Sequence, residues 1–495
     1  MSIIRKTFIV NMAIIFALMI MRSQAFSADL EIEILYETTE TSVVEVVGRF
    51  TDSGDMAVKN WVFADSYADA SGLGKRVSDF RLYDSNGTEF PVKKFGNGEF
   101  AAAEVGAGFR YSVDLSIPKE MTSTAHISWL DKSSGFLMLY DLLPKFKNKR
   151  VSTKISFRLP EGWEARSSER KIKRNEYLVD DIENAVFFVG KDVREVSKTI
   201  EGTNVRLITR GKWQFGDEEA LQISSQIFAE YRRVLGNPPK SDVVIFLSQF
   251  PEVAAFDRWR AETRGANVIL ISSPATFVTR ATQQLHEQLR HELFHLWIPN
   301  GLSLEGDYAW FYEGFAAYQA LKTGVWLGRI RFEDFLDTLS RAININRRRG
   351  QRVPLIEASK TRWADPSSSV YVRGMLVAFL CDAELLKASR GKRELTTIFR
   401  SLLKNDGKSQ GASTANESVL NVLRSYKELQ PIIKNQITGD LQISWALVLE
   451  SFGIEAKSSQ SFIKLAVKDT LSRRQKALIM KLGYNRSRKL LSNNR

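Results

Sequence analysis

Apolar and polar residues alternate with period two in the first part of the chain and recur at helical spacing in the second. Between residues 29 and 196, short alternating runs are separated by turn signals such as Asn86-Gly87 and Asn97-Gly98. Short runs of this kind, bounded by such dipeptides, are typical of an all-β unit. The pattern predicts strands over five segments: 31–36, 43–50, 110–117, 151–159 and 185–189.

The second part of the chain is predicted to be mainly helical. Apolar residues fall at helical spacing over 218–235, and a continuous apolar run over 243–247 predicts a buried strand. Further helices are predicted over 282–297, 310–323, 332–346, 370–387, 394–404 and 445–451. Cys381, the only cysteine, falls in an apolar run and is expected to be a buried thiol. The fold class is therefore expected to be α+β and multidomain, with an N-terminal all-β domain over 29–196 and a helical domain over 197–456.

The first 28 residues have the composition of an export signal. Two basic residues, Arg5 and Lys6, precede an apolar stretch over 8–21 that only Asn11 interrupts, and small residues stand at 25, 27 and 28. A basic start, an apolar middle and small residues at a cleavage site characterise signal peptides. We expect removal of residues 1–28 and a periplasmic or secreted protein, with an uncleaved membrane anchor as the alternative.

Positive charge is concentrated at the two ends of the chain. The 495 residues carry a formal net charge of +13 from 70 basic and 57 acidic residues, but fourteen basic and one acidic residue lie in 1–28 and 457–495, which leaves 56 of each between them. A folded body without net charge argues against nucleic acid as a partner. The basic C-terminal tail over 457–495 either contacts an anionic membrane surface or packs on the body through its apolar residues, Leu478, Ile479, Leu482 and Leu490.

Three of the four histidines lie within ten residues of one another. His291 and His295 enclose the segment 291–295 (His-Glu-Leu-Phe-His), and His286 precedes it. Helical residues four apart share a face, so His291 and His295 can bind one metal ion while Glu292 reaches the attacking water. His286 is expected to face solvent or to support this site from outside, and His126 lies in a predicted β segment that is distant in sequence. Neither histidine is needed for the site.

A third metal ligand is expected from Glu313, within the segment 310–315 (Trp-Phe-Tyr-Glu-Gly-Phe). Catalytic zinc takes three protein ligands and keeps a fourth position open. The seventeen residues between His295 and Glu313 are enough for one helix to end, turn and return beside itself. A zinc-activated water would then attack a peptide carbonyl with Glu292 as general base, and Tyr371 is the candidate donor to the oxyanion.

These segments resemble the gluzincin metallopeptidases. The resemblance rests on the His-Glu-x-x-His helix, on Glu313-Gly314, and on a Tyr-x-Arg-Gly segment at 371–374, which begins 58 residues after Glu313. The segments at 371–382 and 439–454 are most similar to the glycyl-aminopeptidase family, whereas Trp297 and Asn300 are similar to the alanyl-aminopeptidase family.

The resemblance implies a thermolysin-like, mainly helical catalytic domain over 197–456. It also implies one zinc ion held by His291, His295 and Glu313, with Glu292 as base and acid and Tyr371 as oxyanion donor. The 43 residues after Phe452 are too few for the PDZ domain that usually follows in the glycyl-aminopeptidase family.

One element of these families is expected to be missing. Their aminopeptidases carry a glutamate on a strand before the zinc helix, and this glutamate holds the α-amine of the substrate. The segment 265–270 (Gly-Ala-Asn-Val-Ile-Leu) has the strand character but no carboxylate, and its apolar run is expected to pair with an extended substrate. Glu262 and Glu305 are the alternative acids for an amine.

The sequence therefore predicts an exported zinc metallopeptidase that acts on peptides or unfolded proteins. Two alternatives remain: an aminopeptidase with a non-standard amine anchor, and a peptide-binding or chaperone-like protein on a metallopeptidase fold. Glu292 separates the second alternative from an enzyme, because binding alone does not require a base.

Overall fold

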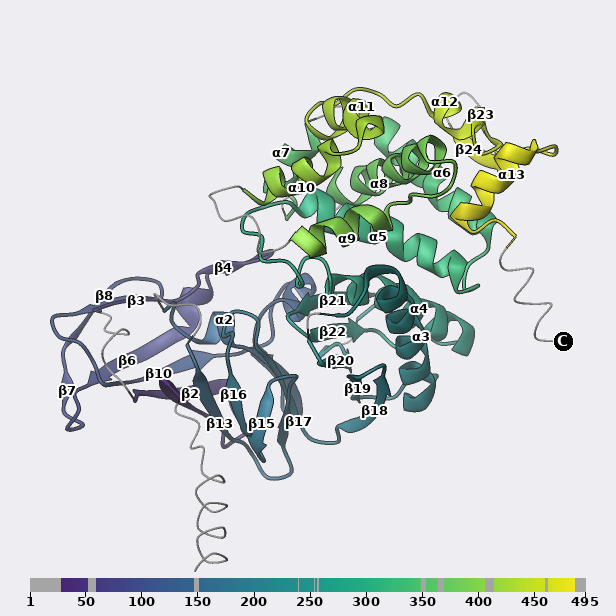
Figure 1. The fold of residues 1–495 in the computed structure, drawn as a ribbon. Helices are drawn as coiled ribbons and strands as arrows, with labels where there is room; N and C mark the ends of the chain where they lie inside the picture. Colours follow the sequence, from purple (N-terminus) through teal and green to yellow (C-terminus); the bar gives the residue numbers. More distant parts are fainter. Residues whose placement is uncertain are drawn as a thin grey trace, which may run out of the picture.

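The computed structural model describes residues 28–51, 59–146, 151–238, 240–252, 254–255, 258–348, 353–363, 369–405, 414–458 and 462–485. Apart from Ala28, the expected export signal lies outside these residues. Over the described part of the chain, no helix is both long and apolar enough to cross a membrane. The structure is an α+β arrangement, with a β-rich N-terminal part and a largely helical C-terminal part (Figure 1).

The N-terminal part is built from β-sheets, and all five predicted strand segments are strands. The largest sheet has eight strands in the order β15 (Arg170–Lys173), β16 (Glu176–Val179), β13 (Thr153–Arg158), β1 (Leu30–Leu35), β2 (Val43–Phe50), β10 (Gly108–Asp114), β6 (Val77–Tyr83) and β7 (Glu89–Phe90). A second sheet has the order β11 (Trp129–Leu130), β12 (Ser134–Met138), β17 (Val186–Gly190) and β14 (Glu164–Arg166). Smaller sheets join β3 (Asn60–Val62), β9 (Glu99–Ala102) and β8 (Val92–Gly96), and β4 (Ser66–Tyr67) with β5 (Ala70–Ser71).

A five-stranded mixed sheet follows. Its order is β18 (Arg194–Ile200), β19 (Thr203–Thr209), β20 (Asp242–Gln249), β22 (Asn267–Ser272) and β21 (Trp259–Arg264). The three inner strands are parallel, and the two edge strands are antiparallel to their neighbours. Val196 lies within β18, so this residue already belongs to the five-stranded sheet.

Side chains that alternate along β20 enter two different cores. Val243, Ile245 and Leu247 pack into the core of the helical part. Val244 and Phe246 pack with Trp129 and other residues of the four-stranded sheet. Because β20 is covered on both faces, its sequence is continuously apolar. The shared core holds the N-terminal part against the sheet that carries the helices.

The helices that follow agree closely with the helical periodicity. They are α3 (Asp217–Leu235), α4 (Val278–His295), α5 (Ala309–Trp326), α6 (Phe332–Arg348), α7 (Leu355–Lys360), α8 (Ser369–Ala388), α9 (Thr396–Asn405), α10 (Ala415–Arg424) and α12 (Trp445–Glu450), with a short helical stretch over 427–437. Of these helices, α7, α10 and the stretch over 427–437 lie in segments where no helix was predicted.

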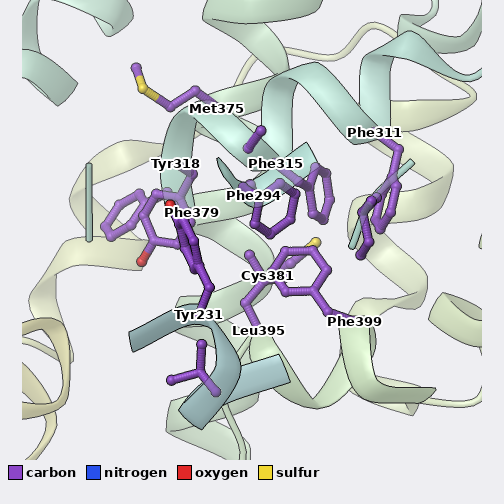
Figure 2. Close-up of a cluster of buried hydrophobic side chains, with 14 of the residues drawn as sticks. Tyr231, Phe294, Phe311, Phe315, Tyr318, Met375, Phe379, Cys381, Leu395 and Phe399 are labelled. Atoms are coloured by element: carbon purple, nitrogen blue, oxygen red, sulfur yellow. The ribbon is translucent and has the colours of Figure 1, made fainter. Parts of the chain in front are cut away.

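An aromatic core packs behind the zinc helix candidate α4. Phe294 of α4 contacts Tyr231 of α3 and Phe399 of α9, and Phe399 also contacts Phe311 and Phe315 of α5 (Figure 2). Cys381 is 1% exposed within the same cluster, which confirms a buried thiol. This packing fixes α4 and α5 relative to one another.

The C-terminal segment packs on the helical part. A hairpin of β23 (Ile454–Ser458) and β24 (Ile463–Val467) precedes α13 (Arg473–Ile479). Leu478, Ile479 and Leu482 are buried in the helical core, and Leu490 lies outside the described residues. These three side chains therefore pack on the body, which is one of the two arrangements that the sequence allowed.

A buried ion pair joins α5 to α8. Lys322 Nζ lies 2.7 Å from Asp382 Oδ2, and the two side chains are 2% and 0% exposed. Asp382 also accepts hydrogen bonds from Tyr318 Oη and the Leu395 backbone amide. We expect Lys322→Ala to lower the free energy of unfolding by about 3–5 kcal/mol, because it leaves a buried carboxylate without its counter-charge. Denaturant unfolding, with the exposed Lys198→Ala as control, measures this, and a loss below about 1 kcal/mol would contradict it.

Candidate metal centre and its cleft

Two histidines of α4 lie side by side at its C-terminal end. His291 and His295 are one helical turn apart, and their ring centroids are 4.8 Å apart. The opposite face of α4 carries Leu285, Leu289 and Leu293, which are buried against the helical core. The apolar face thus turns both imidazoles away from that core and towards the cleft.

The carboxylate of Glu313, on α5, lies beside the two imidazole rings. Its Oε2 atom lies 3.2 Å from His291 Nε2 and 3.5 Å from His295 Nε2, and the two Nε2 atoms are 3.2 Å apart. Tetrahedral zinc with bonds of about 2.0–2.1 Å places neighbouring ligand atoms about 3.3 Å apart. The three atoms therefore have the mutual spacing of three corners of such a tetrahedron, and this donor set fits zinc with one position left open.

Neighbouring groups orient the three candidate ligands. His295 Nδ1 lies 2.8 Å from the Ile298 carbonyl oxygen, and donation to this carbonyl leaves Nε2 with its lone pair facing the metal position. Glu313 Oε1 accepts a hydrogen bond of 2.9 Å from Arg362, so Oε2 is the oxygen turned to the histidines. Burial lowers the pKa of His295, but the hydrogen bond to Glu313 and its charge raise it to about 9.

Glu292 lies beside this centre, in the cleft wall. Its carboxylate is 4% exposed, and the Thr263 hydroxyl lies 2.9 Å from Glu292 Oε2. Burial raises the pKa of Glu292, which makes the carboxylate a better proton acceptor than an exposed glutamate. The hydroxyl of Thr263 therefore holds the carboxylate of a candidate base in one orientation.

Tyr371 of α8 faces the same cleft. Gly314 of α5 and Gly374 of α8 bring the two helices into backbone contact, since a Cβ on Gly314 would lie 2.4 Å from the Gly374 Cα atom. This close approach places Tyr371 beside the centre, with its ring 6.5 Å from that of His291. Burial, together with the charge of Glu313, raises the pKa of Tyr371 well above its usual value, so its hydroxyl stays protonated and can donate.

Arg373, the arginine of the Tyr-x-Arg-Gly segment, has a structural role. Its guanidinium is 6% exposed and donates to the carbonyl oxygens of Gln436 and Gly439 at 2.8 Å, and also to that of Val353. The side chain thus ties α8 to the end of the helical stretch over 427–437 and to the segment at Val353, and it does not line the cleft.

The candidate centre opens into a cleft of about 710 Å³. The edge strand β21 forms one wall, and the N-terminal part supplies a facing wall with Tyr67, Asp69, Thr122 and His126. Arg362 and Trp363 close a third side, and Arg362 stacks on Trp363 with a distance of 4.2 Å to the ring centroid. Residues far apart in the sequence therefore meet here.

The expectation that His286 faces solvent or supports the site was wrong, and the structure also brings His126 to the cleft. His126 lines the cleft, and its Nδ1 atom lies 2.7 Å from Glu262 Oε2. His286 faces neither solvent nor the centre: it is 3% exposed, and neither ring nitrogen has a hydrogen-bond partner among the described residues. It lies five residues before His291, which turns it about 140° around the helix. Burial accordingly lowers the pKa of His286 to about 3.

The expectation that the segment 265–270 pairs with an extended substrate was also wrong. Residues 267–272 form β22, which is hydrogen-bonded to β20 and β21 on both sides and has no free edge. The edge strand beside the cleft is β21, and Glu262 of this strand lines the cleft. Glu305 lies on an exposed loop and does not line the cleft.

The carboxylate of Glu262 is already surrounded by donors. Oε1 accepts hydrogen bonds from Tyr67 and from Arg264 Nε, and Oε2 contacts His126. Burial raises the pKa of Glu262, but the charges of Arg264 and His126 lower it to about 2. Glu262 is thus ionised, and its charge is offset by Arg264, which stacks on Tyr67 at 3.9 Å.

Sequence reasoning missed four contributors to this cleft: Tyr67, Thr263, Arg264 and Arg362. Three of them gave no signal, because their importance depends on contacts between distant segments. The alternation of charged residues over 258–264 was visible, and with hindsight it marks a half-exposed edge strand.

No protein-family model matches this sequence, and no curated protein matches it. Solved structures share its fold. An aminopeptidase N family protein from Idiomarina loihiensis superposes with a TM-score of 0.71 at 17% identity, covering 87% of this chain and 82% of that chain. An M1 zinc metallopeptidase from Deinococcus radiodurans, as a variant bound to a Tyr-Ser-Ala substrate, gives a TM-score of 0.58 at 13% identity over 84% of this chain and 94% of that chain. The chain thus has the multidomain α+β fold of M1 zinc metallopeptidases.

Proposed function

We propose that this protein is an exported zinc metallopeptidase that hydrolyses peptide bonds. One observation carries the proposal: His291, His295 and Glu313 place three ligand atoms 3.2–3.5 Å apart, beside a buried glutamate that a purely structural metal would not need. The fold of M1 zinc metallopeptidases, which this chain shares, supports the proposal. By the same reasoning we propose that 197–456 is a thermolysin-like catalytic domain.

The residues divide the chemistry among themselves. Zinc, when bound, supplies Lewis-acid polarisation of the attacking water and of the substrate carbonyl. Glu292 accepts the proton of the attacking water and passes it to the leaving amine. Tyr371 donates its hydroxyl proton in a hydrogen bond to the carbonyl oxygen as negative charge develops there. Arg362 donates to Glu313 Oε1 and holds this carboxylate in place.

The edge strand β21 is the natural docking edge for an extended substrate. It is the last strand of the five-stranded sheet, and residues 258–264 line the cleft. A peptide added as a further strand gains main-chain hydrogen bonds that do not depend on its side chains. We therefore expect unfolded or short peptides as substrates.

The surroundings of Glu262 favour a peptidase that does not depend on a free α-amine. An ammonium group would have to displace Tyr67, His126 or Arg264 from this carboxylate, and Arg264 would repel it. An aminopeptidase is the second candidate, because Glu262 is nonetheless an ionised carboxylate in the cleft wall. A protein that only binds peptides has less support, because binding alone requires neither Glu292 nor Tyr371.

A matched peptide mixture tests the proposal. We expect the zinc-loaded protein to cleave N-acetylated peptides at internal bonds about as well as their free counterparts, read by mass spectrometry. Cleavage confined to the first residue of free peptides would establish the aminopeptidase alternative. Failure to cleave any peptide in either form, with one zinc bound, would contradict a peptidase and favour the binding alternative.

Export is a separate proposal, supported by the sequence of residues 1–28. Asp29, the first residue after the expected cleavage site, is already held in the β-rich part, because its amide donates to the Ser152 carbonyl oxygen at 2.8 Å. We expect the mature protein in a bacterial host to start at or within a few residues of Asp29 and to appear in the periplasm or medium. N-terminal sequencing checks this, and an intact N-terminus in the membrane fraction would favour the anchor instead.

A further inference from the structure

One stretch of the cleft wall carries positive charge that the proposed chemistry does not use. Residues two apart on a strand point to the same side, so Arg258, Arg260, Glu262 and Arg264 share one side of β21 and of its extension. Backbone hydrogen bonds between Arg258 and Ser273 continue the strand pairing to residue 258. Three cations and one anion therefore follow one another along this wall.

Glu262 and Arg264 compensate each other, but the two other arginines form no ion pair with an acidic residue that the structure describes. Arg260 donates from Nη1 to the Trp259 carbonyl oxygen at 2.7 Å, while its buried Nε atom has no hydrogen-bond partner. The guanidinium of Arg258 has no hydrogen bond or ion pair with any described residue. Burial and the charge of Arg258 both lower the pKa of Arg260, which reports two like charges close together in the wall.

The facing wall only partly offsets these charges. Asp69 lies on that wall and acts on Arg260 through its charge, but the two side chains form no ion pair, and Asp69 instead accepts a hydrogen bond of 3.0 Å from Ser123. Asp69 therefore does not neutralise Arg260 by direct contact. An anion between the two arginines would relieve their repulsion and satisfy the free guanidinium donors.

We propose that Arg258 and Arg260 form a subsite for a carboxylate side chain of the substrate, so that preferred peptides carry Asp or Glu at a fixed distance from the scissile bond. This inference rests on the proposed peptidase function and specifies its substrate class. Carboxylates fit because the guanidinium fork binds them through two parallel hydrogen bonds.

The strand sets that distance. Thr263 contacts Glu292 and marks the position of the reacting bond along β21. Arg260 lies three residues away from Thr263, which corresponds to about 10 Å on a strand that rises about 3.3 Å per residue. A substrate extended alongside β21 advances at the same rate. The acidic side chain is therefore expected about three residues from the scissile bond, on one side of it.

A positional peptide series tests the subsite. One internally cleaved neutral peptide is resynthesised with a single Glu, or a single Gln of the same shape, at each of four positions on either side of the cut. For the zinc-loaded wild type we expect kcat/KM to be about tenfold higher for Glu than for Gln at a position about three residues away, and equal within twofold next to the cut. The preference should shrink as salt is raised.

Variants assign the preference to the two arginines. Arg260→Gln should abolish the Glu preference, so that kcat/KM for the Glu and Gln peptides becomes equal within twofold, and Arg260→Lys should restore part of the preference. Arg258→Gln should reduce the preference. Arg329→Gln, an exposed arginine that does not line this cleft, is the matched control and should behave as the wild type.

The outcomes separate this inference from the proposed function. If the wild type cleaves Glu and Gln peptides equally at all positions, or if Arg260→Gln keeps the preference, the subsite is refuted and the peptidase stands. If the zinc-loaded wild type cleaves nothing, the peptidase is refuted, and binding of labelled peptides decides the subsite. In that case at least fivefold tighter binding of the Glu peptide, lost in Arg260→Gln, would support it, and equal binding would overturn it.

Discussion

Glu292→Gln is expected to lower kcat/KM for peptide hydrolysis by about 10²- to 10⁴-fold, the range that a positioned general base contributes. The amide has the shape of the carboxylate and still accepts the hydrogen bond from Thr263, but it takes no proton from the attacking water. Because Glu292 is not one of the three clustered ligands, the variant should bind one zinc ion per chain, as the wild type does. Peptide cleavage and elemental analysis on the same samples measure both quantities.

The matched control is Glu287→Gln, an exposed glutamate on the same helix. It removes the same charge from α4 without touching the cleft, and wild-type activity is expected. Unchanged activity in Glu292→Gln would eliminate the assigned base. Loss of zinc in this variant would instead show that the carboxylate holds the metal.

His295→Ala is expected to abolish both zinc binding and activity at ordinary zinc concentrations. The change removes one of three ligand atoms and leaves Glu313 and Arg362 around an incomplete site. The loss of zinc affinity should exceed the 10- to 100-fold effect that removing an outer hydrogen-bond partner of a ligand causes. Equilibrium competition with a zinc-binding dye measures the affinity, and cleavage of the same peptides measures the activity.

His286→Ala provides the control for this experiment, since it removes a buried histidine from another face of the same helix. This variant is expected to keep one zinc ion and its activity, even if its thermal stability falls. A His295→Ala protein that retains full zinc content would refute the ligand set. Equal zinc loss in both variants would indicate damage to α4 rather than removal of a ligand.

Local patterns predicted the elements and the composition of the centre. The segment 291–295 requires only a helix to place His291 and His295 on one face, and the helical periodicity around it provides that helix. Glu313 follows after a turn of the length that returns the next helix to the first. Period-two segments became strands for the same reason, because one residue in two must face a core.

The walls of the cleft could not be predicted in this way. His126 and Tyr67 reach Glu262 across more than one hundred residues of sequence, through packing of the four-stranded sheet on the five-stranded sheet. The sequence also could not show which strand lies at the edge of the sheet. β21 and β22 follow one another in the chain, and their order in the sheet is set by tertiary contacts.

By itself, the sequence determined that this chain is an α+β protein whose helix-borne His-Glu-x-x-His segment places two histidines on one face, because spacing along a helix is a local property. It also indicated Glu313 as a third candidate ligand and Glu292 as a candidate base. Only the tertiary structure decided what surrounds them. Gly314 and Gly374 bring Tyr371 to the centre, Arg264 and His126 contact the carboxylate of Glu262, and Arg258 and Arg260 form no ion pair within the described part of the chain. Charge compensation depends on distances between side chains from different elements, and those distances exist only once the sheets and helices have packed.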